Sequence, residues 1–311
     1  MSAQHCSDRA RVLEPDDAGL YSSNNEQPRD RGRRDEYMKE DLVFAFIGGG
    51  NMAGSLIGGL ISGGCRPEQF RVSDPDPQQR ERLWQRFGIQ ATDSNQQAVS
   101  GADVVVLAVK PQAAPEALAG LGSSAPDALF ISVIAGIREE QLKRWLSTGA
   151  VVIRAMPNTP ALLGCGVSGL HAAPSISAQQ REIAENVMRS SGAVVWVEQE
   201  VLLDPVTAVS GSGPAYFFLL MEAMTRAGVE LGLAPEAARL LTQETALGAA
   251  RMALESDDDV ADLRRRVTSP GGTTAAALAV LQARDVPGAI GEAVRAACER
   301  AAKLADEFGQ A

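Results

Sequence analysis

The spacing of hydrophobic positions changes twice along the chain and divides it into three parts. Residues 1–40 are rich in Arg, Asp, Asn, Ser and Gln and have almost no apolar periodicity, so we expect a disordered tail. In residues 41–203, short β-rich runs alternate with helical patterns. In residues 204–311, apolar residues recur every three or four positions, which is typical of amphipathic helices. An alternative to a disordered tail is that Met38 is the natural start of the protein.

The middle part predicts a parallel sheet. Strands are expected at 43–47, 70–73, 104–108, 129–133, 151–156 and 193–197, with helices at 52–61, 77–87, 111–118 and 139–145. Strands that alternate with crossover helices form a parallel sheet covered on both faces. The predicted fold class is therefore α/β: a Rossmann-like, doubly wound parallel sheet in 41–203, followed by an all-helical domain in 204–311.

Composition narrows the function classes. With 45% apolar and 22% charged residues, the 311-residue chain can form one large or two ordinary domains. The longest aliphatic run, 104–109, is too short to span a membrane, and no signal peptide is evident, so we expect a cytoplasmic protein. A net charge of −10 argues against nucleic acid as a partner. The four cysteines show no CxxC spacing, so we expect reduced thiols and no metal site.

A glycine motif opens the predicted sheet domain. "FAFIGGGNMAGSLIGGL" places Gly48, Gly50 and Ala53 in the pattern G-x-G-x-x-A, between a buried strand and a helix. The glycines permit a tight turn and let the backbone approach a pyrophosphate, which then lies at the helix N-terminus. In this context the motif predicts dinucleotide binding rather than a purely structural turn.

The residues at the end of the second predicted strand do not decide between NAD and NADP. Asp74 lies where an acid would hold the ribose diol of NAD, whereas Ser73 and Arg80 are suited to accommodate the 2′-phosphate of NADP.

Histidines are scarce, which limits acid–base chemistry. The chain has only His5, in the predicted tail, and His171, expected in a loop or at a sheet edge with a structural role. A dehydrogenase that relies on a histidine acid or base is hard to assemble from these two. A reductase without a histidine acid or base should act on a substrate that needs little acid–base catalysis. A cyclic imine is such a substrate, because its carbon accepts hydride directly once the nitrogen is protonated.

Five motifs together resemble the pyrroline-5-carboxylate reductase family. They are "IGGGNMA", "AVKPQ", "RAMPNTPAL", "VTAVSGSGPAYFFLLMEAM" and "VTSPGGTTAAAL", in the family's order and spacing, and the resemblance covers roughly residues 42–308. It implies reduction of 1-pyrroline-5-carboxylate to L-proline, the last step of proline biosynthesis. NADPH is the expected cofactor on the resemblance alone, with NADH possible. It also implies a homodimer through the helical domain, assembled further into a form such as a ring of dimers.

The resemblance assigns site residues position by position. The positions that it assigns to the cofactor are Gly48, Gly50, Asn51, Met52, Ala53, Ser73, Asp74, Asn95, Ala108, Val109, Lys110, Pro111, Val133, Ile134 and Ala135. Asn95 is nearly as well suited to cap a helix. The "SPGGTT" turn is expected to hold the substrate carboxylate, through backbone at Gly271, Gly272 and Thr273 and hydroxyls of Ser269 and Thr274. Glu200 matches an acid beside the substrate ring, or is a solvated surface residue.

The segment 213–224, "GPAYFFLLMEAM", predicts a helix that starts at Pro214 and is apolar on more than one side. Such a helix should be deeply buried, and in so small a domain this suggests a partner chain.

Two other functions stay open. A β-hydroxyacid dehydrogenase also joins a dinucleotide domain to a helical one but relies on a helical lysine, where the nearest candidates here are Arg251 and Arg264–Arg266. A nucleotide-sensing scaffold would bind the cofactor without turnover.

Overall fold

The computed structural model describes residues 42–147 and 149–309, so the predicted tail lies outside the described residues. The described chain forms two compact units: one runs to Gly211 and resumes at Arg300, and the other is Ser212–Glu299. No helix in the described ranges is both long and apolar enough to cross a membrane.

The first unit contains an eight-stranded sheet with the order β3-β2-β1-β4-β5-β6-β7-β8. Its strands are β1 (Phe44–Ile47), β2 (Phe70–Ser73), β3 (Ala91–Thr92), β4 (Val104–Leu107), β5 (Leu129–Ser132), β6 (Val151–Met156), β7 (Gly166–Ala172) and β8 (Gly192–Trp196). All neighbouring pairs are parallel except β6 and β7. The predicted α/β fold, a mostly parallel doubly wound sheet followed by helices, is confirmed.

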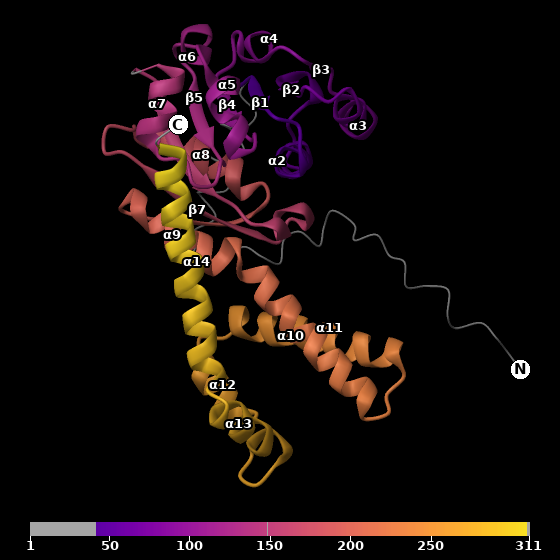
Figure 1. Ribbon diagram of the computed structural model, residues 1–311. Helices are drawn as coiled ribbons and strands as arrows, with labels where there is room; N and C mark the ends of the chain where they lie inside the picture. Colours follow the sequence, from indigo (N-terminus) through magenta and orange to yellow (C-terminus); the bar gives the residue numbers. More distant parts are fainter. Residues whose placement is uncertain (1–41, 148, 310–311) are drawn as a thin grey trace, which may run out of the picture. The chain divides into compact units, whose positions relative to one another are not determined.

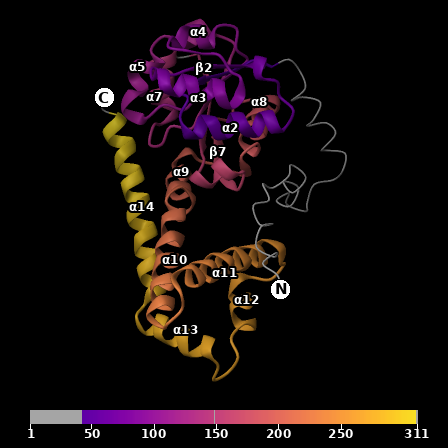
Figure 2. The ribbon, with the colours of Figure 1, turned by 90° about the vertical axis from the view of Figure 1, so that its right-hand side faces the viewer.

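Helices cover both faces of the sheet (Figure 1 and Figure 2). One face packs on α2 (Asn51–Ser62), α3 (Pro77–Phe87) and α8 (Ala178–Arg189); the other packs on α4 (Asn95–Val99), α5 (Ala114–Leu118), α6 (Leu121–Ser124) and α7 (Glu139–Leu146). Successive strand residues alternate between the two cores: Phe44 and Phe46 point to the first, Ala45 and Ile47 to the second. Because both faces of each central strand are buried, its residues form a continuous apolar run, as in other sheets covered on both faces.

Two strands were missed by the sequence analysis. β3 has only two residues, too few for a periodicity signal. β7 contains Ser168 and two glycines, and its burial follows from pairing with β6 and β8 rather than from an apolar run. The prediction that His171 lies in a loop or at an edge is therefore wrong, because it lies within β7, opposite Arg154 of β6.

The second unit is helical. It contains α10 (Gly213–Glu230), α11 (Pro235–Glu255), α12 (Val260–Arg266) and α13 (Thr273–Ala283). α14 (Val286–Gly309) begins in this unit, and its last part, from Arg300 on, belongs with the sheet unit. There Ala301 and Ala305 are buried, and the Gln141 side chain donates to the Ala305 carbonyl over 3.3 Å.

The boundary between the units differs from the sequence-based position at residues 203 and 204. η5 (Glu200–Leu202), α9 (Leu203–Val206) and the π-helical turn η6 (Thr207–Gly211) belong with the sheet unit. Leu203 and Asp204 are buried there, so this helical stretch packs as part of the sheet unit although its local pattern resembles the helices that follow.

The prediction that α10 is deeply buried is wrong for the single chain. Pro214 does lie in its first turn, but Gly213 is its one buried residue. Phe217, Phe218 and Leu219 are 64%, 64% and 67% exposed. The helix is apolar on more than one side, and one chain covers too little of that surface.

Candidate functional site

Predicted cofactor residues meet at one edge of the sheet, where the strand order reverses. β1 lies between β2 and β4, so the chain leaves β1 toward one side and later returns on the other. Loops at the carboxyl ends of strands around such a switch point form a crevice that binds ligands. Except for Asn95, all the predicted cofactor positions lie in the loops after β1, β2, β4 and β5 or directly beside them. Ser73 ends β2, Pro111 begins the short helix after β4, and the first turn of α2 contains Asn51, Met52 and Ala53.

The two glycines of the motif have different surroundings. Gly48 has φ +94°, and a Cβ built there would lie 2.7 Å from the Ala108 carbonyl oxygen, so backbone packing requires glycine. Gly50 has φ −67° and is the N-cap of α2, with no atom within 4 Å of a built Cβ. No side chain caps α2 and no acid lies in its first turn, where Asn51 and Met52 are followed by Ala53. The loop thus leaves an open cradle at a helix N-terminus, which fits a pyrophosphate.

The end of β2 contacts this loop directly. The Asp74 carboxylate accepts from Gly49 N over 2.8 Å and from Asp76 N over 2.9 Å. Ser73 is 1% exposed, and its hydroxyl has no hydrogen-bond partner among the described residues. The Ser73 side chain therefore points into the protein, and its contact with the cofactor stays a prediction.

The loop after β4 lies beside the glycine loop, and the loop after β5 follows a strand that pairs with β4. Ala108 N donates to Ile47 O over 2.8 Å, and Val133 N donates to Leu107 O over 3.0 Å, so both loops continue the sheet before they turn away. Val109 lies against Gly48, and Lys110 with Pro111 begins the short helix η3 (Pro111–Ala113). Ile134 is 2% exposed, whereas its neighbours Val133 and Ala135 are less buried.

Asn95 is not the cap of its helix. Ser94 is the N-cap of α4 and accepts from Gln97 N, and the Asn95 amide donates to the Ala117 carbonyl over 3.0 Å. The capping alternative for Asn95 is therefore wrong, and its contact with the cofactor stays a prediction.

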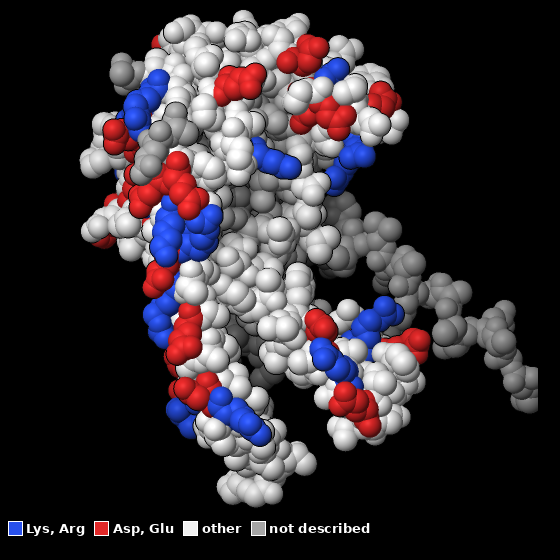
Figure 3. Space-filling view, in the orientation of Figure 1, with Lys and Arg blue, Asp and Glu red and all other residues white. Residues whose placement is uncertain are grey.

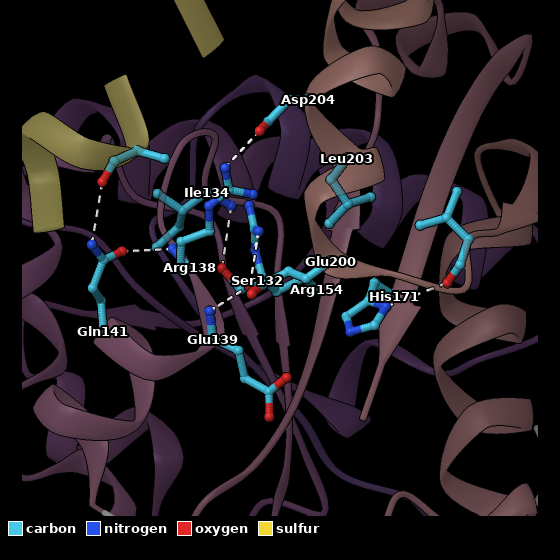
Figure 4. Close-up of polar contacts among 12 residues, drawn as sticks. Ser132, Ile134, Arg138, Glu139, Gln141, Arg154, His171, Glu200, Leu203 and Asp204 are labelled. Carbon is cyan, nitrogen blue, oxygen red and sulfur yellow. Dashed lines mark hydrogen bonds and ion pairs between the residues drawn. The ribbon is translucent and has the colours of Figure 1, made fainter. Parts of the chain in front are cut away.

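Glu200 is part of a partly buried ionic network (Figure 4). Its Oε1 accepts from Arg154 Nη1 over 2.9 Å and from Glu139 N over 2.6 Å, and nearby Arg138 pairs with Asp204 over 2.5 Å. The Arg154 side chain is 6% exposed. Burial lowers the pKa of the Arg154 guanidinium, and the Glu200 carboxylate opposes this shift. Glu200 is thus not a solvated surface residue, and its predicted contact with the substrate stays a prediction.

This network and one asparagine were missed by the sequence analysis. The signal for Arg154 was available, since one arginine in the buried run "VVIRAM" requires a partner. Asn158, in the motif "RAMPNTPAL", is 8% exposed and links two segments: it donates to Ser210 O over 3.2 Å and accepts from Val167 N over 2.9 Å. It thereby anchors η6, and such π-helical turns often occur at functional sites.

The "SPGGTT" turn lies in the helical unit. Gly272 N donates to Ser269 O over 3.0 Å, and Gly271 has φ +71°. With Pro270 as the second residue, this is the pattern of a type II β-turn, in which the third residue must be glycine-like. α13 begins at Thr273, as predicted, with Gly272 as its N-cap and no side-chain cap. The first amide groups of α13 are therefore available to an anion.

Titratable groups add little to the chemistry of the site. His171 is 8% exposed, and its Nδ1 lies 3.3 Å from the Val197 carbonyl oxygen (Figure 4).

On the face shown in Figure 3, acidic and basic side chains are interspersed. Within the described ranges, no cluster of His, Cys, Asp or Glu has the arrangement of a metal site.

Comparisons with known proteins agree with this geometry. A family model described as pyrroline-5-carboxylate reductase dimerisation matches residues 200–304, and one described as NADP oxidoreductase coenzyme F420-dependent matches residues 43–136. The chain is 51% identical to the pyrroline-5-carboxylate reductase of Pseudomonas aeruginosa over 268 residues, which cover 86% of this chain and 98% of that protein.

Solved structures show the same similarity. A pyrroline-5-carboxylate reductase from Coxiella burnetii has a TM-score of 0.81 and 40% identity, covering 85% of this chain and 99% of that one. The Plasmodium falciparum pyrroline carboxylate reductase with NADP bound has a TM-score of 0.77 and 28% identity, covering 86% and 99%.

Proposed function

This chain belongs to the pyrroline-5-carboxylate reductase family, and from this we propose that it reduces 1-pyrroline-5-carboxylate to L-proline, the last step of proline biosynthesis. The observation that carries this function is the match over 98% of the Pseudomonas aeruginosa reductase, and the two matching family models include the glycine loop (residues 43–136) and the "SPGGTT" turn (residues 200–304). The enzyme is an oxidoreductase that uses NADPH, with NADH possible.

The residues around the glycine loop fit this cofactor. The open space at Gly50 and the uncapped start of α2 would receive the pyrophosphate, while the loops after β4 and β5 would line the dinucleotide toward its nicotinamide end. When bound, the cofactor supplies a hydride. The protein's part is to bind it, orient it and keep water from the reacting carbon.

The chemistry needs no general acid from the protein. Once the imine nitrogen carries a proton, hydride adds to the C=N carbon, a C–H bond forms, and the electron pair of the C=N π bond moves to nitrogen. Solvent then protonates the amine of proline. His171, the one histidine of the described residues, is held in a strand, and the Glu200 carboxylate is occupied by Arg154. Neither arrangement resembles a proton donor poised for transfer.

We further propose that the turn 269–274 holds the substrate carboxylate. Support comes from the positive φ of Gly271, the uncapped N-terminus of α13 and the hydroxyls of Ser269 and Thr274, which together offer donors to an anion. Glu200 as an acid near the substrate ring is a weaker proposal, because its carboxylate already has two partners.

The protein forms a homo-oligomer. We propose a homodimer through the helical unit, assembled further into a form such as a ring of dimers. Support comes from the apolar surface of α10, where Phe217, Leu219 and neighbouring side chains are more than half exposed in one chain. A cytoplasmic location is also proposed, since biosynthetic reductases of this kind depend on a reduced nicotinamide pool.

The function is tested by incubating the full chain with NADPH and 1-pyrroline-5-carboxylate. We expect loss of the absorbance of NADPH matched one to one by proline formation. A chain that binds NADPH without turnover would be a nucleotide-sensing scaffold. Turnover of a β-hydroxyacid with NADP, but not of the imine, would make it a β-hydroxyacid dehydrogenase.

A further inference from the structure

The turn after β2 carries two carboxylates near the place where a bound dinucleotide has its adenosine ribose. Asp74 follows β2 directly, and Asp76 caps α3 two residues later. At this position of a dinucleotide-binding sheet, an acid accepts a hydrogen bond from the ribose 2′-hydroxyl, whereas a nearby arginine accommodates a 2′-phosphate. The family's use of NADPH leads one to expect the second arrangement.

The Asp74 carboxylate is fixed toward the glycine loop. Its Oδ2 accepts from Gly49 N over 2.8 Å, and its Oδ1 accepts from Asp76 N over 2.9 Å. The Asp74 backbone is also held, because its N–H donates to Thr92 O over 3.0 Å. The side chain cannot turn away from the glycine loop without losing these two hydrogen bonds, so its charge stays at the turn after β2, where an acid would face the ribose of a bound dinucleotide.

The two groups that would favour a 2′-phosphate, the Ser73 hydroxyl and the Arg80 guanidinium, are less available to a ligand. Ser73 is 1% exposed, so its hydroxyl is not presented to a ligand. Arg80 lies in α3 and its side chain reaches the turn, but its Nη1 donates to the carbonyl oxygens of Asp74 and Pro75 over 2.7 Å and 3.1 Å. A 2′-phosphate carries roughly two negative charges at neutral pH and would meet the fixed carboxylate at close range.

We propose that Asp74 is a specificity-determining residue that keeps NADH competitive with NADPH in this enzyme, by accepting from the 2′-hydroxyl of NADH and repelling the 2′-phosphate of NADPH. Arg80 supplies the opposing attraction for that phosphate. This inference rests on the proposed reductase function, because it concerns the same cofactor site.

The test is calorimetric titration of the full chain with NADPH and with NADH, in the absence of the imine. For the unmodified chain, we expect dissociation constants within about tenfold of each other. In Asp74→Asn, the amide oxygen can still accept from Gly49 N, but the charge is gone. The ratio of the two dissociation constants should move at least about tenfold toward NADPH, the effect of one close charge. Arg80→Gln should move it the other way.

Asp76→Asn is the matched control. It removes the same charge two residues away, and asparagine caps a helix as well as aspartate does. We expect its ratio to change by less than about threefold. An unmodified chain that prefers NADPH by more than a hundredfold, or an Asp74→Asn shift no larger than that of Asp76→Asn, would overturn the proposal.

Asp74→Ser provides a second variant if thermal unfolding shows that Asp74→Asn does not fold, and it should shift the ratio in the same direction. If the unmodified chain binds neither cofactor, the reductase function fails and this proposal fails with it. That outcome is distinct from tight binding with an unchanged ratio, which would overturn only the role of Asp74.

Discussion

Replacing Gly50 by valine should weaken cofactor binding while leaving the fold intact. A Cβ at Gly50 meets no atom within 4 Å, and φ −67° with ψ −168° suits a β-branched residue. The expected cost to folding is the loss of a favourable N-cap, about 0.5–1.5 kcal/mol. For a protein of this size, that lowers Tm by only a few degrees, roughly 2–4 °C per kcal/mol.

The cost to binding should be larger. The added methyl groups would occupy the space where the backbone of the loop approaches the pyrophosphate, and the bound phosphate would be pushed away from the amide groups of α2. Each lost hydrogen bond to a charged group costs about 1.5–3 kcal/mol. The dissociation constants of both NADPH and NADH should therefore rise by roughly ten- to a hundredfold for each bond lost.

Gly48→Ala is the matched control within the same motif. Its Cβ would lie 2.7 Å from the Ala108 carbonyl oxygen at φ +94°. We expect this variant to lose about 2–4 kcal/mol of unfolding free energy through strain and overlap. Urea unfolding and calorimetric titration would be measured for both variants. Unchanged cofactor affinity in Gly50→Val, or a loss of stability as large as that of Gly48→Ala, would refute the reasoning.

Three further predictions address the substrate, the network and the assembly. Thr274→Ala should raise the KM for the imine and lower kcat/KM by roughly ten- to a hundredfold, with the shape of the pH profile unchanged; a lost limb of that profile would instead mean proton transfer at the turn. Glu200→Gln should lower the unfolding free energy by about 3 kcal/mol in urea, because Arg154 loses its counter-charge while 6% exposed; unchanged stability with a raised KM would place the carboxylate at the substrate. Leu219→Lys should reduce the molar mass measured by light scattering, since a charge would enter the proposed dimer surface; an unchanged mass would put the interface elsewhere.

Much of the fold was predictable because its signals are local. Five of the eight strands begin or end at the predicted residue, since apolar runs bounded by turns mark buried parallel strands directly. α3 begins at Pro77 and ends at Phe87 as predicted, because Asp76 caps it and Gly88, at φ +71°, ends it.

The site was predictable only in part. The open cradle at Gly50 and the helix start at Thr273 follow from glycines at fixed spacing, because glycine permits backbone conformations and close approaches that other residues disfavour, whatever surrounds it. The ion pair of Glu200 could not be predicted from local sequence spacing. Its partner Arg154 lies 46 residues earlier in the chain, and their contact exists only because β6 and η5 pack together.

By itself, the sequence determined the alternation of strands and helices, the glycine loop, the turn before α13 and, through five motifs together, the family. Tertiary structure alone decided that β7 runs antiparallel to β6, that Arg154 meets Glu200, and that Asp74 is fixed toward Gly49. The physical reason is the range of the interactions. Backbone conformation and periodicity depend on neighbours within a few residues, whereas strand register and buried ion pairs depend on which distant segments the folded core brings together.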